Sequence, residues 1–199
     1  MESACWNCGA ATPARFCAAC KALQPPSSDY FEFFEIPRQL ALDPADLEKR
    51  FYALSRKLHP DLFSRKSPRE QQYSLDASAV LNDAYRVLKD PVARALYVLK
   101  QEGFDVAEQG TKEVPPELLE EVFELNMALE DEDAAPQVAE ALQRFQSMQQ
   151  EIDTALQMKF AAWDASHDAV TLGEVRALLN RRKYIANLID KASHVPDRI

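Results

Sequence analysis

A pair of helical segments separated by a proline places the strongest constraint on how this sequence can fold. After Asp43, a capping residue, leucine and phenylalanine recur at intervals of 4, 3 and 4 residues, which is the spacing of one helix face. The helix must end before Pro60, because the residue before a proline disfavours the helical conformation. Ser67 then begins a second helix. The sequence therefore predicts two antiparallel helices whose connection, residues 59–66, carries His59-Pro60-Asp61 at its tip.

The first of these helices also has a basic face. Four cations lie within roughly 120° of arc, centred about 130° from the apolar stripe. They are Lys49, Arg50, Arg56 and Lys57. A solvated polar face is one interpretation, but such a concentration of positive charge is unusual in a chain of net charge −9. We therefore expect this basic face to contact an acidic partner surface.

The negative charge is concentrated in the C-terminal half of the chain. Residues 101–199 hold 9 basic and 20 acidic residues, which would repel a phosphate backbone, so we expect no nucleic-acid partner. No apolar run approaches the ~20 residues that a membrane helix needs, so we expect no membrane partner. The N-terminus has the pattern of neither a signal peptide nor an Arg-rich transit peptide. We expect a cytoplasmic protein in a reducing compartment.

All four cysteines lie near the N-terminus, in two CxxC pairs. They are Cys5, Cys8, Cys17 and Cys20. Each pair can present two thiolates to one side of a tetrahedral ion, and zinc accepts four such ligands. We expect a structural zinc site with no open position for catalysis, and iron is the alternative metal because ligand type does not separate the two. Redox or incidental thiols are the competing interpretation.

The C-terminal part predicts a bundle of three antiparallel helices. Apolar periodicity and capping signals place them at about 116–131, 135–166 and 172–193. The second helix carries a seam with alternating spacings of 4 and 3, and the third begins at an expected capping box, Thr171 to Glu174. Short connections make consecutive helices antiparallel neighbours.

The whole chain is therefore predicted to be all-α apart from its N-terminal segment. The predicted order is a metal knuckle at 1–24, a linker at 25–28, a helical-hairpin domain at 29–102, a linker at 103–115 and the three-helix bundle at 116–199.

The first bundle helix has more apolar surface than a bundle core requires. Beyond its core-facing stripe, Leu119, Phe123 and Met127 form a second stripe about 130° away. This second stripe is either buried against the preceding domain or exposed as a docking strip edged by Glu120 and Glu124. We expect a docking strip.

The basic helix, the loop with His59-Pro60-Asp61 and the return helix together resemble a J-domain. The match extends further, to Arg94-Ala95-Leu96-Tyr97-Val98-Leu99 after Asp90-Pro91, to the segment 118–129 and to the C-terminal bundle. Residues 29–195 are thus similar to the HscB family, the J-proteins of iron–sulfur cluster assembly. The two CxxC pairs are similar to those of some members, particularly the eukaryotic ones.

The resemblance implies a co-chaperone and not an enzyme. Its J-domain would stimulate ATP hydrolysis by a DnaK-class, HscA-like chaperone, and its bundle would hold an IscU-like cluster scaffold protein. Glu120 stands where the family often has an apolar residue, and Met127 stands where an acidic one is common. The family's scaffold contacts carry over onto Leu119, Phe123, Glu124 and Tyr184.

Docking, and not catalysis, is the role expected of His59-Pro60-Asp61. It lacks a nucleophile, and the sequence shows no orienting partner for the His59 ring, which could equally cap or pack the loop. Two other functions stay open. One is a J-domain co-chaperone for general folding clients, with the bundle as a dimerisation surface. The other is a thiol redox or metal-transfer protein.

Overall fold

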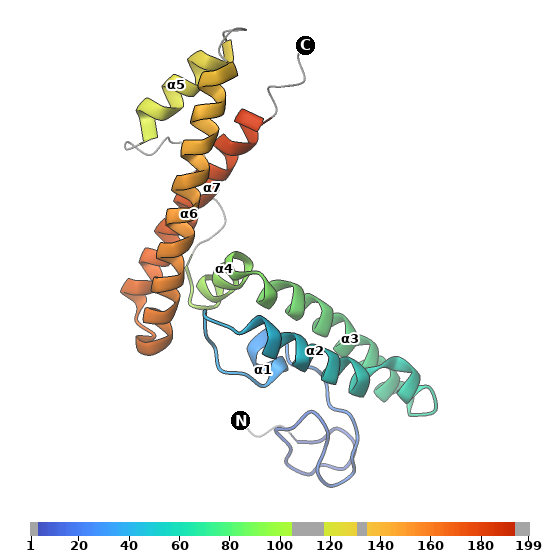
Figure 1. Cartoon of the computed structure of the whole chain (residues 1–199). Coiled ribbons are helices and arrows are strands. Elements are labelled where there is room, and N and C mark those ends of the chain that lie inside the picture. Colours follow the sequence, from blue (N-terminus) through green and yellow to red (C-terminus); the bar gives the residue numbers. More distant parts are fainter. Residues whose placement is uncertain (1–3, 105–117, 131–134, 194–199) are drawn as a thin grey trace. The chain divides into compact units, whose positions relative to one another are not determined.

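The computed structural model describes residues 4–104, 118–130 and 135–193 of the chain, and their secondary structure is helical apart from two isolated β-bridges. The chain divides into two compact units, Met1–Arg94 and Ala95–Ile199 (Figure 1). None of the helices in these ranges is long and apolar enough to cross a membrane. The predicted all-α fold is confirmed, whereas most of the predicted linker at 103–115 lies outside the described residues and the domain boundaries stay predictions.

The first unit is built on the predicted hairpin of α2 (Pro44–Leu58) and α3 (Pro68–Lys89). Asp43 caps α2 by accepting the backbone N–H of Ala45 at 3.0 Å, and Ser67 caps α3 by accepting that of Glu70 at 3.3 Å. A short 3₁₀ turn, η1 (Pro60–Phe63), follows α2 directly and was not predicted. A further helix, α4 (Pro91–Gln101), follows α3 and contains the boundary between the two units.

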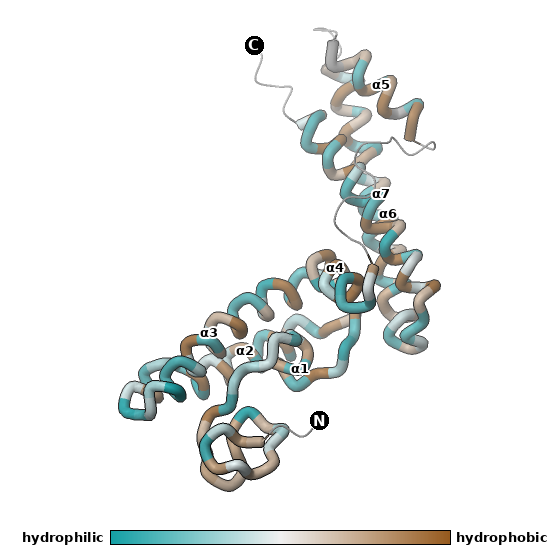
Figure 2. The backbone as a smooth tube through the Cα atoms, turned by 180° about the vertical axis from the view of Figure 1, so that it is seen from behind, coloured by the Kyte–Doolittle hydropathy of each residue, from teal (hydrophilic) through white to brown (hydrophobic). Residues whose placement is uncertain are grey.

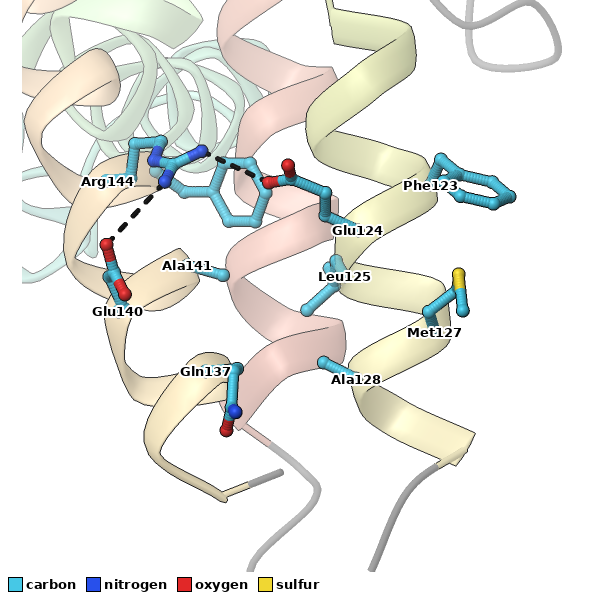
Figure 3. Close-up of a pocket in the computed structure, with 10 residues that line it drawn as sticks. Phe123, Glu124, Leu125, Met127, Ala128, Gln137, Glu140, Ala141 and Arg144 are labelled. Atoms are coloured by element: carbon cyan, nitrogen blue, oxygen red, sulfur yellow. Dashed lines mark hydrogen bonds and ion pairs between the residues drawn. The ribbon is translucent and has the colours of Figure 1, made fainter. Parts of the chain in front are cut away.

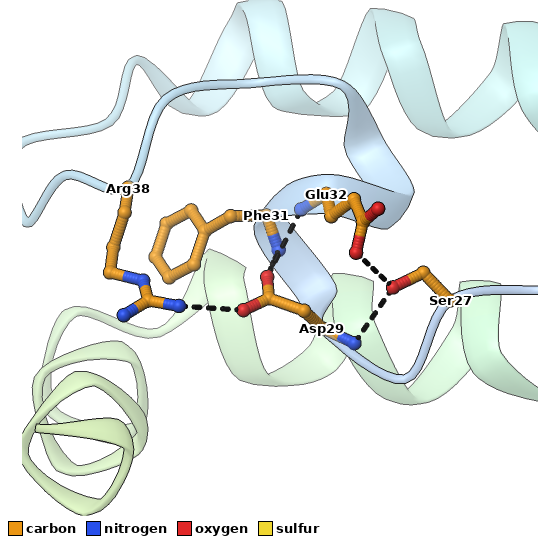
Figure 4. A network of polar contacts seen from close by, with 5 residues as sticks. All are labelled: Ser27, Asp29, Phe31, Glu32 and Arg38. Carbon is orange, nitrogen blue, oxygen red and sulfur yellow. Dashed lines mark hydrogen bonds and ion pairs between the residues drawn. The ribbon is translucent and has the colours of Figure 1, made fainter. Parts of the chain in front are cut away.

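A polar network at the start of α1 (Tyr30–Phe34) fixes the aromatic part of this unit's core (Figure 4). Asp29 accepts the N–H groups of Phe31 and Glu32 at 2.9 and 3.0 Å through one carboxylate oxygen. Its other oxygen binds Arg38 at 2.8 Å, and Ser27 accepts the N–H of Asp29 at 3.2 Å. This cap orients a helix that is too short to be stable alone. The helix carries Phe31, Phe33 and Phe34, which are all buried.

A buried arginine joins two distant parts of the first unit. Arg94 is 5% exposed, and its Nε donates to the carbonyl of Leu40 at 2.8 Å. Its Nη1 donates to the carbonyl of Leu88, near the end of α3. One guanidinium therefore satisfies backbone carbonyls from segments 54 and 6 residues away, and holds the α1–α2 connection against the end of α3.

The second unit contains the antiparallel three-helix bundle of α5 (Leu119–Glu130), α6 (Ala135–Ser166) and α7 (Ala169–Ser193). The bounds of α6 agree with the prediction, but α7 begins earlier than predicted. Its cap is Asp168 and not Thr171: the Asp168 carboxylate accepts the N–H of Thr171 at 2.7 Å and its hydroxyl at 2.8 Å. Hydrogen bonds from Ser166 and then from Thr171 lower the pKa of Asp168 to about 2. The predicted capping box at Thr171 is therefore wrong.

The bundle core follows the predicted seam from Val138 to Trp163, in which Leu142 is half-buried and two polar residues interrupt the apolar pattern. Gln149 and Lys159 are only half-buried, and the Nζ of Lys159 pairs with Glu174 across the helix interface at 2.6 Å. Phe160, the residue after Lys159, is buried in the core instead of Lys159. The other buried members of α6 are Val138, Phe145, Ile152, Leu156 and Trp163.

The buried arginine leads to the first prediction. Replacing Arg94 with alanine leaves the carbonyls of Leu40 and Leu88 without their charged donor, and we expect a loss of about 3 kcal/mol in the stability of the first unit. Trp6 lies in this unit and Trp163 in the other, so urea unfolding followed by Trp6 fluorescence in a Trp163→Phe background isolates the transition. Arg86→Ala, an exposed arginine on α3, is the control and should cost less than ~0.5 kcal/mol. Equal losses in the two variants would refute the role of Arg94.

Candidate functional site

The loop after α2 is ordered by its own hydrogen bonds. The His59 ring accepts the backbone N–H of Asp61 at its Nδ1 atom, at 3.3 Å, and the backbone carbonyl of His59 accepts the N–H of Leu62 at 3.0 Å. Oδ2 of Asp61 lies 3.5 Å from the same Nδ1. Phe63 is buried and anchors the turn. His59 therefore has a partner within the loop and caps η1, which is the capping role that the sequence left open for its ring.

The start of α3 holds both ends of this loop. Ser74 donates its hydroxyl to the carbonyl of Leu58 at 2.7 Å, where α2 ends. Gln71 donates its amide to the carbonyls of Ser64 and Lys66 at 3.3 and 2.9 Å. The backbone of the loop is thus fixed, while the side chain of Asp61 is 89% exposed. A fixed backbone with an exposed carboxylate suits binding to a cationic group on a partner.

Three of the four predicted cations on α2 are exposed: Lys49, Arg56 and Lys57. The fourth, Arg50, is half-buried, and its Nε binds Asp46 at 2.7 Å. Such a surface pair contributes little to stability, so Arg50 can exchange Asp46 for a carboxylate on a partner at small cost. The four cations thus lie at the surface of α2, and their contact with a partner stays a prediction.

Two exposed apolar side chains near this face were missed by the sequence reasoning. Tyr52 is 54% exposed and Leu62, next to Asp61, is 60% exposed. The position of Tyr52 held a usable signal, because it lies three residues after Lys49 and four before Arg56, which places it on the basic face. Leu62 follows no helical periodicity, and its exposure depends on η1.

The predicted strip on α5 is exposed in the bundle. Leu119, Phe123 and Met127 are 55%, 64% and 59% exposed. In the core-facing stripe, Leu118 and Leu125 are 0% and 1% exposed and Val122 is half-buried. Hydrophobic residues accordingly recur along much of α5, beyond those that the core requires (Figure 2).

A groove of about 430 Å³ runs between α5 and α6 beside this strip. Arg144 of α6 crosses it and pairs with Glu124 at 3.4 Å and with Glu140 at 3.7 Å (Figure 3). Phe123 and Met127 point to the side of α5 away from Arg144. The groove and the strip thus offer an apolar surface with charged groups along one edge. The remaining lining residues are Leu125, Ala128, Gln137, Ala141 and Phe145.

Tyr184 differs from the other predicted scaffold contacts. It lies on α7 and is only 9% exposed, and burial raises its pKa. Its contact with a partner would therefore be limited to an edge of the side chain. Glu120, predicted to lie at the edge of the strip, is exposed.

The four cysteines converge as predicted. Their sulfur atoms all lie within 4.8 Å of one another, with Cys5 and Cys20 3.7 Å apart and Cys8 and Cys17 also 3.7 Å apart. A disulfide would require about 2.05 Å. A tetrahedral ion with metal–sulfur bonds of about 2.3 Å separates its sulfur ligands by about 3.8 Å. The cluster is therefore spaced for a metal ion.

Hydrogen bonding and charge in the cluster also fit a cation. Burial raises the pKa of Cys5, but N–H groups of Asn7 and Cys8 outweigh it and lower that pKa to about 6. The N–H of Ala10 lowers the pKa of the Cys8 thiol. Hydrogen bonding with the other cysteines, Cys20 first, together with burial, outweighs this effect and raises that pKa to about 12. The thiols cannot all ionise so close together unless a positive ion compensates their charge. The side-chain amide of Gln24 donates to the sulfur of Cys5 at 3.4 Å, as an outer-shell donor would.

Two family models match this chain. One described as DnaJ domain matches residues 29–97, and one described as HSCB C-terminal oligomerisation domain matches residues 114–193. Over 194 residues the chain is 32% identical to the iron-sulfur cluster co-chaperone protein HscB of Homo sapiens, covering 94% of this chain and 80% of that one. It is 35% identical over 178 residues to a co-chaperone protein HscB homolog of Vibrio cholerae, covering 86% and 98%.

Two solved structures are also similar. The crystal structure of human co-chaperone protein HscB has a TM-score of 0.74 at 31% identity and covers 96% of this chain and 97% of that one. Chaperone HscB from Vibrio cholerae has a TM-score of 0.60 at 28% identity, covering 85% and 98%.

The cysteine cluster leads to the second prediction. We expect the purified chain to bind one equivalent of zinc, measured by native mass spectrometry, and Cys17→Ser to lose most of that metal because a hydroxyl is a poor replacement for a thiolate. Ala19→Ser is the control, since Ala19 is exposed between Cys17 and Cys20 and offers no ligand. Full metal content in Cys17→Ser would contradict the four-sulfur site.

Proposed function

This chain belongs to the HscB family of J-domain co-chaperones of iron–sulfur cluster assembly, and we propose that it stimulates the ATPase of a DnaK-class, HscA-like chaperone and delivers the cluster scaffold protein to it. One observation carries the proposal. The same chain carries an exposed Asp61, on a loop that hydrogen bonds from α3 hold in place, and an exposed apolar strip on α5. The relatives are named as co-chaperones, which agrees with a regulator and not an enzyme.

The loop and the basic face form the chaperone-binding end of the proposal. Asp61 binds a cationic group of the ATPase, while Lys49, Arg56 and Lys57 contact an acidic surface and speed association. Arg50 joins them by leaving Asp46. His59 and Pro60 shape the turn and do not transfer protons. Binding shifts the ATPase toward its hydrolysing conformation, because the J-domain binds that conformation more tightly than the alternative.

The bundle forms the scaffold-binding end. Leu119, Phe123 and Met127 supply apolar area for an IscU-like scaffold protein, and Glu124 supplies charge at the edge. Arg144 keeps the Glu124 carboxylate oriented, and Tyr184 supports the site from α7 with the small part of its side chain that is exposed. Because one chain carries both ends, the bound scaffold is held at high effective concentration near the ATPase.

The knuckle has a structural role in this proposal, with zinc as its metal. Four thiolates complete a tetrahedral shell and leave no position for a substrate, which agrees with folding and not with catalysis or metal transfer. Iron remains compatible with the same ligands. The free thiols suit a reducing, cytoplasmic compartment.

The third prediction concerns Asp61. We expect Asp61→Asn to reduce stimulation of the partner ATPase at least tenfold in a steady-state assay, because the amide keeps the size of the side chain and removes its charge. The loop should stay folded, since its hydrogen bonds to Asp61 use backbone atoms. Asp83→Asn, also exposed but on α3, is the matched control and should stimulate normally. If Asp61→Asn stimulates as well as the wild type, the proposed chaperone contact is wrong.

The fourth prediction concerns Phe123. We expect Phe123→Ala to weaken binding to the scaffold protein about tenfold by calorimetry, because an exposed aromatic at the centre of an interface contributes strongly. Stimulation of the ATPase without scaffold should not change. Met158→Ala removes an equally exposed apolar side chain from α6 and serves as the control. Equal scaffold affinity for Phe123→Ala and wild type would refute the docking strip. If the wild-type chain binds an unfolded polypeptide as tightly as it binds the scaffold protein, a general folding client is favoured instead.

A further inference from the structure

The cysteine knuckle contacts the start of α3 through a cluster of three side chains, Trp6, Arg69 and Tyr73. The Trp6 and Tyr73 rings meet edge to face, with centroids 6.1 Å apart. The Arg69 guanidinium lies 4.9 Å from the Trp6 ring and 5.8 Å from that of Tyr73, and its Nε donates to the Tyr73 hydroxyl at 3.0 Å. This geometry combines aromatic and cation–π attraction in one contact.

The position of Trp6 depends on the folded knuckle. Trp6 lies between Cys5 and Cys8, so the first CxxC turn sets its backbone. Its indole N–H donates to the carbonyl of Leu23 at 2.8 Å, just beyond the second CxxC turn, and Leu23 is fully buried. Both halves of the knuckle therefore determine the orientation of the ring.

A second contact fixes the knuckle to α1. Arg15 donates to the backbone carbonyl of Phe33, pairs with Glu35 at 3.4 Å and lies 4.9 Å from the Phe33 ring. With two separate attachments, to α1 and to α3, the knuckle cannot pivot about either one. It is therefore a fixed part of the first unit and can transmit restraint to the helix that it contacts.

The turn of α3 that the knuckle contacts is the turn that holds the tripeptide loop. Arg69 and Tyr73 lie roughly 150° around the helix from Gln71 and Ser74, which bind the loop. Helix ends fray, and fraying here would release Gln71 from the carbonyls of Ser64 and Lys66. A contact on the opposite face suppresses that fraying.

We propose that the cysteine knuckle is a brace for the chaperone-binding loop, with Trp6 and Arg69 as positioning residues that hold the first turns of α3 and so keep His59-Pro60-Asp61 in its binding conformation. This inference rests on the proposed function for its effect on the ATPase. Weakening the brace lowers the fraction of protein whose loop is competent to bind. The concentration needed for half-maximal stimulation then rises, and the stimulation at saturation does not change.

The test uses the full chain with its metal bound. Hydrogen exchange of the amides of Leu62, Ser64 and Lys66, all hydrogen-bonded within the loop, is compared in wild type, Trp6→Ala and Arg69→Gln. We expect about fivefold faster exchange of these amides and, in ATPase titrations, a higher half-maximal concentration with equal maximal stimulation. Trp6→Phe, which keeps an aromatic ring, should restore most of both, and Arg86→Gln is the charge-matched control on α3.

The brace would be overturned if the loop amides of both Trp6→Ala and Arg69→Gln exchange at the wild-type rate. It would also be overturned if exchange in Arg86→Gln rises as much as in those two variants. If Trp6→Ala loses its metal, Arg69→Gln decides alone, because it leaves the knuckle's own residues unchanged. A wild-type chain that does not stimulate the ATPase would instead refute the proposed function, and the exchange rates would still decide whether the knuckle holds the loop.

Discussion

The hydrogen bonds from α3 to the loop at residues 59–66 are the interactions on which the rest of the first unit depends. Pro60 ends α2 and leaves backbone carbonyls without helical partners. Ser74 satisfies the carbonyl of Leu58, and Gln71 satisfies those of Ser64 and Lys66. The helix thus holds the loop through its backbone, so the exposed Asp61 carboxylate need not contribute to folding.

In the proposed function, the two units bind their partners with different chemistry. The first presents an exposed carboxylate and a basic face on a rigid hairpin, which gives orientation and rapid association. The second presents apolar side chains on α5, supported by a core that α6 and α7 supply. Apolar area contributes affinity without directional contacts, which suits holding a protein client. The proposed function depends on both ends acting within one molecule.

Local signals explain what the sequence predicted correctly. Caps at Asp43 and Ser67 and the apolar periodicity determined α2, α3 and α6, and the CxxC spacing determined the sulfur cluster. The errors arose where a nearby alternative competed, as at Asp168, which caps α7 in place of Thr171. The Trp6–Tyr73 contact joins residues with no shared periodicity, so only the folded chain shows it. The exposure of the strip on α5 followed from its excess apolar surface, whereas docking by the loop depends on a partner that the sequence does not contain.

Complementation between two defective proteins tests most directly whether both ends must be in one molecule. Asp61→Asn keeps the scaffold-binding strip, and Phe123→Ala keeps the chaperone-binding loop. The measurement is the steady-state ATPase of the partner chaperone with scaffold present and both variants mixed in equal amounts. Physical linkage predicts that the mixture stimulates no more than Phe123→Ala alone. Recovery of the wild-type, scaffold-dependent rate by the mixture would contradict the account.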